Sequence, residues 1–165
     1  MKASGKVELM KADTWAAWSR SLTVGAALVV VLTETVAAQV ATQVSVWSGV
    51  YTEVQSKRGQ VLYSGACSQC HGPRLNGAAQ SDQPPSPAIA RAGFLRKWDG
   101  KTVAELFTYV HKMMPTDNPG TLTDQQAIDS IAYMFAVSEI PAGDKELPTD
   151  PKVLEGIVIG DKPKK

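Results

Sequence analysis

Apolar residues recur at helical spacing in two stretches of the chain. Each stretch has apolar side chains at positions i, i+3, i+4 and i+7, which together form one face of a helix. The two sets are Val103, Leu106, Phe107 and Val110, and Ile128, Ile131, Ala132 and Phe135. A third stretch, from residue 52 towards residue 66, has apolar Val54, Val61 and Leu62. The pattern predicts three main helices.

Each expected helix begins with the signature of a capping box, a Thr followed three residues later by Glu or Gln. The pairs are Thr52 with Gln55, Thr102 with Glu105, and Thr123 with Gln126. After residue 38, no stretch of roughly 4–8 residues alternates convincingly between apolar and polar, as a strand does. The sequence therefore predicts an all-α fold.

Glycine and proline fill the segments between the expected helices. The segment 72–93 contains Pro84, Pro85 and Pro87. A loop of this length is uncommon in a compact domain unless it serves a function. We therefore expect a contact other than helix packing to hold it.

An uncharged run, residues 22–32, lies between Arg20 and Glu34 near the start of the chain. A basic segment, an apolar core and small residues after it are the parts of a secretory signal peptide. The alternative is an uncleaved membrane anchor, but a span needs about 20 apolar residues, which this run does not supply. Cleavage is the favoured interpretation.

Val36 and Ala38 suit the small-residue positions of a cleavage site, so we expect residues 1–38 to be removed on export to the periplasm. No stable membrane span would then remain. The segment before the apolar core is long, and a start at Met10 would give a signal of more ordinary length.

The rest of the chain divides into three predicted parts. Residues 39–51 are polar and β-branched without a helical period, and we expect an extended N-terminal arm. Residues 52–147 hold the expected helices and form the domain. Residues 148–165 are rich in proline and lysine and are predicted to be an irregular tail. Three apolar residues can partly hold this tail: Leu154, Ile157 and Ile159.

Composition narrows the possible functions. A chain of 165 residues with 44% hydrophobic and 20% charged residues suits one domain. Its 17 Lys and Arg against 16 Asp and Glu give a net charge of +1. A nucleic-acid-binding protein needs a clustered basic excess, so nucleic acid is not the expected partner. Only two cysteines are present, which excludes a disulfide-rich scaffold and a four-cysteine zinc module.

Both cysteines lie in one motif, Cys67-Ser68-Gln69-Cys70-His71. Two thiols at this spacing can each add to one vinyl group of a haem, and the adjoining histidine can then bind the iron. The C-x-x-C-H motif therefore predicts one covalently bound haem c, with Cys67 and Cys70 holding the porphyrin and His71 the iron.

Three other interpretations use the same atoms. A redox dithiol normally lies beside a βαβ pattern, which is absent from the sequence. A zinc site needs two further ligands, and His111 is the one plausible candidate left. A structural disulfide is possible in an oxidising compartment.

Residues 48–147 resemble a class I cytochrome c. The resemblance is carried by the residues around C-S-Q-C-H-G, by Leu75-Asn76-Gly77, by Phe94 and Trp98, and by M-M-P-T-D-N-P-G-T-L-T-D-Q-Q. Within that family the chain is most similar to small monohaem cytochromes that accompany quinoprotein (PQQ-dependent) dehydrogenases. The resemblance implies three main helices wrapped round the haem and a methionine, here Met114, as the second iron ligand.

Local chemistry agrees with Met114. The residue before a proline is driven out of the helical region, so Pro115 should end the second helix and make Met114 begin an extended loop. Met113 lacks this constraint, and Met134 lies within the third helix, where a core role is more common. A thioether opposite an imidazole favours ferrous iron, and iron held on both sides suits electron transfer.

The resemblance implies further contacts. Gly59 and Tyr63 on the first helix and Tyr133 on the third resemble the close helix crossing of the family. Trp98 resembles the position whose indole N–H meets a haem propionate, although an ordinary core tryptophan has the same sequence signal. The carbonyl of Pro85 or Pro87 is expected to orient His71. His111, at a helix end, is read as a surface histidine.

The sequence thus predicts a periplasmic one-electron carrier rather than an enzyme. The resemblance implies that it accepts electrons from a quinoprotein dehydrogenase and passes them to another cytochrome or a terminal oxidase. The alternative is a haem protein that binds small ligands, or a catalytic redox subunit, in which the distal ligand Met114 is displaced.

Overall fold

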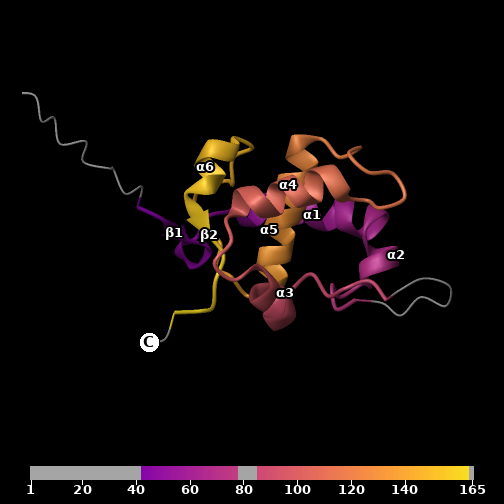
Figure 1. Cartoon of the computed structure of the whole chain (residues 1–165), viewed down its shortest axis with the longest axis horizontal. Helices are drawn as coiled ribbons and strands as arrows, with labels where there is room; N and C mark the ends of the chain where they lie inside the picture. Colours follow the sequence, from indigo (N-terminus) through magenta and orange to yellow (C-terminus); the bar gives the residue numbers. More distant parts are fainter. Residues whose placement is uncertain (1–41, 78–84, 164–165) are drawn as a thin grey trace, which may run out of the picture. The chain divides into compact units, whose positions relative to one another are not determined.

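A computed structural model describes residues 42–77 and 85–163, all of which belong to one compact unit. The expected signal segment 1–38 lies outside the described residues, and so does Pro84. The elements, in chain order, are β1 (Val44–Ser45), η1 (Val46–Ser48), α1 (Glu53–Ala66), α2 (Ser68–His71), α3 (Arg91–Trp98), α4 (Val103–Met113), α5 (Asp124–Val137), α6 (Pro151–Glu155) and β2 (Ile157–Val158) (Figure 1). Among these described helices, none has both the length and the apolar character that a membrane crossing requires.

The three predicted helices are present as α1, α4 and α5, each starting directly after its expected threonine. The boxes at Thr102 and Thr123 are complete, with both the threonine and the partner three residues later bonded. At Thr52 only half of the box forms. The Thr52 hydroxyl accepts from the Gln55 N–H at 3.1 Å, but the Gln55 side chain is used elsewhere.

Gln55 is fully buried and binds the backbone of Leu147 from both sides. Its Nε2 donates to the Leu147 carbonyl at 2.9 Å, and the Leu147 N–H donates to its Oε1 at 2.9 Å. Both polar atoms of the amide are therefore satisfied inside the protein. The predicted box at Thr52 is wrong in its second half because this distant segment competes successfully for the Gln55 amide.

The apolar residues Val54 and Val61 do not form the buried face of helix α1. The side chains of Val54 and Val61 are 63% and 77% exposed, while Gly59 and Tyr63 lie against α5. At Gly59 a Cβ atom would overlap the backbone carbonyl of Asp129. The two helices approach so closely that only a residue without a side chain fits at this point. This confirms the expected close crossing of α1 and α5.

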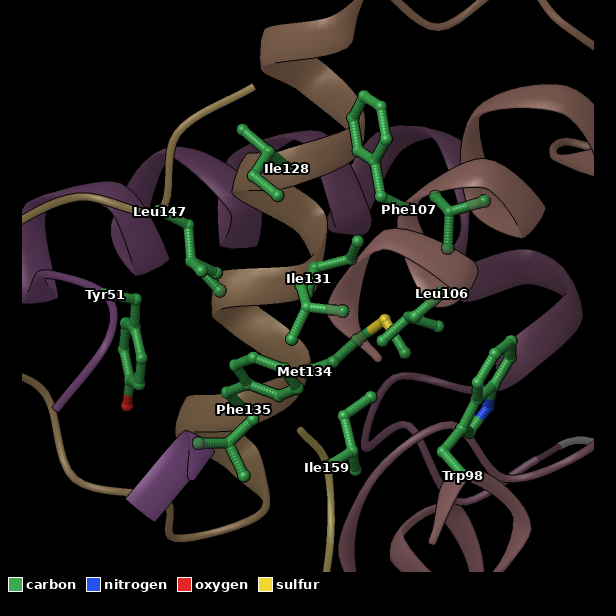
Figure 2. Packing of buried hydrophobic residues seen from close by; sticks show 14 of the residues in the cluster. Tyr51, Trp98, Leu106, Phe107, Ile128, Ile131, Met134, Phe135, Leu147 and Ile159 are labelled. Carbon is green, nitrogen blue, oxygen red and sulfur yellow. The ribbon is translucent and has the colours of Figure 1, made fainter. Parts of the chain in front are cut away.

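The core lies between α5, α4 and the C-terminal residues. Figure 2 shows Ile131, Met134 and Phe135 of α5 directed towards side chains from other elements. Tyr51 packs on Phe135 with ring centroids 6.3 Å apart, and its hydroxyl donates to the Ile140 carbonyl at 2.7 Å. Residues that precede and follow the three helices thus complete the core.

Residues 148–163 contain more structure than the predicted irregular tail. Asp150 caps α6, which starts with Pro151, and β2 pairs in parallel with β1. Trp47 of the N-terminal arm donates its indole N–H to the Gly160 carbonyl at 2.9 Å. Leu154 and Ile159 are fully buried. Pairing and burial therefore order both ends of the described chain, and the arm is not simply extended.

Candidate functional site

One partly open cleft gathers the sequence-predicted site residues. Its empty volume is about 1360 Å³, including its open mouth, and its lining is mainly apolar. The predicted residues on its wall are Cys67, Cys70, His71, Trp98 and Met114. They come from α2, the end of α3 and the end of α4, so the fold brings together residues that are far apart in the sequence.

The two cysteines lie where α1 ends and the single turn of α2 begins. The Cys67 N–H donates to the Tyr63 carbonyl at 3.0 Å, and the His71 N–H donates to the Cys67 carbonyl at 2.9 Å. This continuous turn places both thiols and the imidazole on the cleft wall. The thiols are free and partly buried.

The surroundings of the thiols weaken the competing interpretations. Burial, and secondarily the neighbouring Cys70, raises the pKa of the Cys67 thiol, whereas a redox dithiol works through a lowered pKa. Among the described residues, no group of three His, Cys, Asp or Glu side chains is placed to hold a metal. His111 does not line the cleft and its Nε2 lies 3.3 Å from the Asp124 Oδ1, so it is not placed to join the two thiols in a zinc site.

His71 is oriented by the loop that follows it. Its Nδ1 lies 2.9 Å from the Pro87 carbonyl, so Nδ1–H donates and Nε2 keeps its lone pair. Pro87, not Pro85, therefore supplies the contact that the sequence left open between them. A ring held in this tautomer is a better metal donor.

Glycine turns fold the loop back onto His71. Gly72 and Gly77 have φ of 76° and 80°, in the left-handed region. A Cβ atom at Gly77 would lie 2.6 Å from the Ser86 carbonyl. The Gly77 N–H also donates to the His71 carbonyl at 2.9 Å. These turns are the contacts, beyond helix packing, that hold the described parts of the loop.

Two methionine side chains reach the cleft. Met114 follows the last residue of α4 with φ −117° and ψ 149°, the extended conformation expected before Pro115. Its side chain is half-buried on the cleft wall, whereas Met113 is 53% exposed and does not line the cleft. Met134 lines it too, but is buried in the middle of α5, where Figure 2 shows it beside Leu106.

Aromatic and aliphatic side chains complete the wall. Trp98 is buried and packs edge-on against Tyr109, with ring centroids 5.8 Å apart. Lys101 places its Nζ 5.7 Å from the centre of the Trp98 ring. Lining residues that the sequence did not single out as site residues are Tyr109, Leu106, Val110 and Leu122. The helical period of α4 carried the signal for two of them, since Leu106 and Val110 lie on its apolar face.

Residues 54–134 match the family model described as cytochrome c oxidase, cbb3-type, subunit III. This segment belongs to the cytochrome c family. A comparison with curated proteins finds no match. A solved structure, the sulfane dehydrogenase SoxCD from Paracoccus pantotrophus, is 17% identical with a TM-score of 0.44. The match covers 68% of this cytochrome and 61% of that chain.

As a cytochrome c, the protein carries covalently bound haem c with its iron, and it transfers electrons. The cleft fits this group chemically. It offers two free thiols three positions apart, one imidazole nitrogen with a free lone pair and the thioethers of Met114 and Met134, on a mainly apolar wall. These are the donor types that hold haem c.

Proposed function

We propose that this cytochrome is an exported monohaem electron carrier in which His71 and Met114 would bind the iron. Cys67 and Cys70 would form the thioether bonds, and the Trp98 indole N–H would donate to a haem propionate. One observation carries the proposal: His71, oriented by the Pro87 carbonyl, and Met114, extended by Pro115, line the same cleft.

The bound haem supplies a one-electron change between ferrous and ferric iron. The chain's own residues set the conditions for that change. The Pro87 carbonyl keeps His71 in one orientation and one tautomer. Leu106, Val110 and Leu122 make the wall apolar and keep water away from the site. A thioether ligand and low polarity both favour the ferrous form.

The physiological role follows from these features and from the sequence. Two firm iron ligands leave no open position for a substrate, so we assign an electron carrier rather than an enzyme. The signal-like N-terminal segment supports a periplasmic location. Similarity to cytochromes that serve quinoprotein dehydrogenases supports such a dehydrogenase as donor, with another cytochrome or a terminal oxidase as acceptor.

Substitution of the methionines tests the ligand assignment. Met114→Leu should abolish the far-red methionine–iron band of the ferric protein, lower the reduction potential and allow cyanide to bind. Met113→Leu is the matched control, because Met113 is exposed and off the cleft. It should cost under about 1.5 kcal/mol of stability and leave the spectrum unchanged.

Met134→Leu tests whether Met134, the other methionine on the cleft wall, is the iron ligand instead of Met114. Because the change conserves volume, this buried position should tolerate it, and the variant should keep the methionine–iron band. Loss of the band in Met134→Leu or Met113→Leu, with the band kept in Met114→Leu, would move the ligand to that residue. A five-coordinate spectrum in the unaltered protein would instead favour the ligand-binding alternative.

A further inference from the structure

A contact between an imidazole and a carboxylate lies across the base of the loop that begins with Met114. This loop, residues 114–123, connects α4 to α5. His111 lies in the last turn of α4, and Asp124 is the first residue of α5. The His111 Nε2 lies 3.3 Å from the Asp124 Oδ1. The pair therefore joins the two ends of the loop.

The imidazole of His111 is held in place from its own helix. It stacks on the Phe107 ring one turn earlier, with centroids 5.7 Å apart and planes only 2° from parallel. Phe107 is buried in the core. The stacking favours one ring plane for His111, and in that plane Nε2 lies close to Asp124.

The other polar contacts of the loop are local. The Asn118 N–H donates to the Pro115 carbonyl at 3.0 Å, and the Thr121 hydroxyl donates to the Asn118 carbonyl at 2.9 Å. These bonds shape turns within the loop but do not join α4 to α5. Among the polar contacts found in the described part of the chain, the His111–Asp124 pair alone bridges its two ends.

We propose that His111 is a positioning residue for Met114. By pairing with Asp124 it restrains both ends of the loop, and so keeps the Met114 thioether on the cleft wall. The proposal rests on the assignment of Met114 as an iron ligand. It gives His111, which does not line the cleft, a role in the redox site beyond that of a surface histidine.

Cyanide binding to the ferric holoprotein measures how readily the loop releases Met114. His111→Phe keeps the ring stacking and removes the pair, and Asp124→Asn removes the charge with little change in shape. Each should raise the cyanide association constant about two- to fivefold, the range for a partly exposed ion pair. The double variant should add little to either, because both changes remove one interaction.

Lys112→Gln is the matched control. It removes a positive charge from the same helix end without touching the pair. Its cyanide constant and reduction potential should stay at the unaltered values.

Different results overturn different claims. If Met114→Leu keeps the methionine–iron band, the ligand assignment fails and the positioning role fails with it. If Met114→Leu loses the band but His111→Phe and Asp124→Asn behave like Lys112→Gln, only the positioning role is wrong. The positioning role would also be refuted if the effects of His111→Phe and Asp124→Asn on the cyanide constant added up in the double variant, because the two residues would then act independently.

Discussion

Two buried tyrosine hydroxyls should make the stability of the protein depend on pH in the alkaline range. Tyr51 donates to the Ile140 carbonyl and Tyr63 to the Gly72 carbonyl. Burial, aided by the charge of Glu53, raises the pKa of Tyr51. Burial is also the main reason that the pKa of Tyr63 rises to about 12. Both hydroxyls keep their protons in the folded protein at a pH where an unfolded tyrosine loses its own.

The free energy of unfolding should therefore fall above pH ~10, where unfolded tyrosines ionise. Below that pH both states are protonated and the raised pKa values contribute their full stability. Between pH ~10 and ~12 the release of tyrosine protons stabilises the unfolded chain. The free energy of unfolding therefore falls by up to about 1.4 kcal/mol per pH unit for each tyrosine. Guanidinium unfolding of the holoprotein at pH 8 and pH 11 measures this fall. Tyr51→Phe should make it shallower.

Tyr51→Phe also removes the hydrogen bond to Ile140, which lowers the stability at every pH. The informative quantity is thus the change between the two pH values rather than the stability at either one. An equal change in Tyr51→Phe and in the unaltered protein would contradict the proposed cause.

Site residues could be predicted from the sequence where the signal comes from neighbouring residues. The C-x-x-C-H motif lies within one turn, and Pro115 acts directly on the backbone of Met114. The sequence did not show whether the carbonyl of Pro85 or that of Pro87 contacts His71. It depends on how the turns at Gly72 and Gly77 close the loop, and neither proline differs from the other in its own chemistry.

At the scale of elements, the crossing of α1 and α5 depends on one position without a side chain. Gly59→Ala would place a Cβ atom onto the Asp129 carbonyl, so the helices would have to separate. We expect a loss of about 1–3 kcal/mol, as for other overpacked sites. Thermal unfolding of the holoprotein by circular dichroism measures it.

Gly65, in the same helix, is the matched control. A Cβ atom there would meet nothing within 4 Å. Gly65→Ala should therefore be neutral, or stabilise by up to about 1 kcal/mol through its better helix propensity. If both variants lost stability equally, a general intolerance of change in α1 would explain the result, and the close crossing would not.

The same crossing explains why the positions of the helices were predicted better than the side of each helix that is buried. Caps and periodicity located α1, α4 and α5, because both are local signals. Hydrophobic periodicity alone did not indicate the buried face of α1, because that face uses Gln55 and Gly59; the expectation for Gly59 came from the family resemblance instead. Helix α3 was missed because its start lacks a side-chain cap, and the Arg91 N–H is instead satisfied by the distant Ser138 hydroxyl at 2.8 Å.

At the scale of the whole molecule, an ionic network and the C-terminal residues bind the helices together. Arg58 of α1 forms ion pairs with Asp129 of α5 at 2.9 Å and with Glu146 at 2.7 Å. These are hydrogen-bonded fork contacts, which are more specific in geometry than a point charge. Together with the Gln55 amide, they tie residues 146–147 across the two crossing helices.

Residues beyond the family match lie in the same compact unit as the redox site. The match ends at residue 134, but α6 packs on α4, the helix that Met114 directly follows. Leu154 of α6 is fully buried at this contact. Leu154→Ala should lower the free energy of unfolding by about 2–5 kcal/mol, the cost of a large-to-small change in a core.

The neighbouring Val153 is the matched control, because its side chain is 51% exposed. Val153→Ala should change the stability by no more than about 0.5 kcal/mol. The decisive measurement follows the helix signal and the haem absorption band together during guanidinium unfolding of Leu154→Ala. If the last helix is part of one cooperative unit, both signals disappear at the same lowered midpoint. An early loss of some helix signal, with the band persisting to the unaltered midpoint, would make α6 an independent appendage instead.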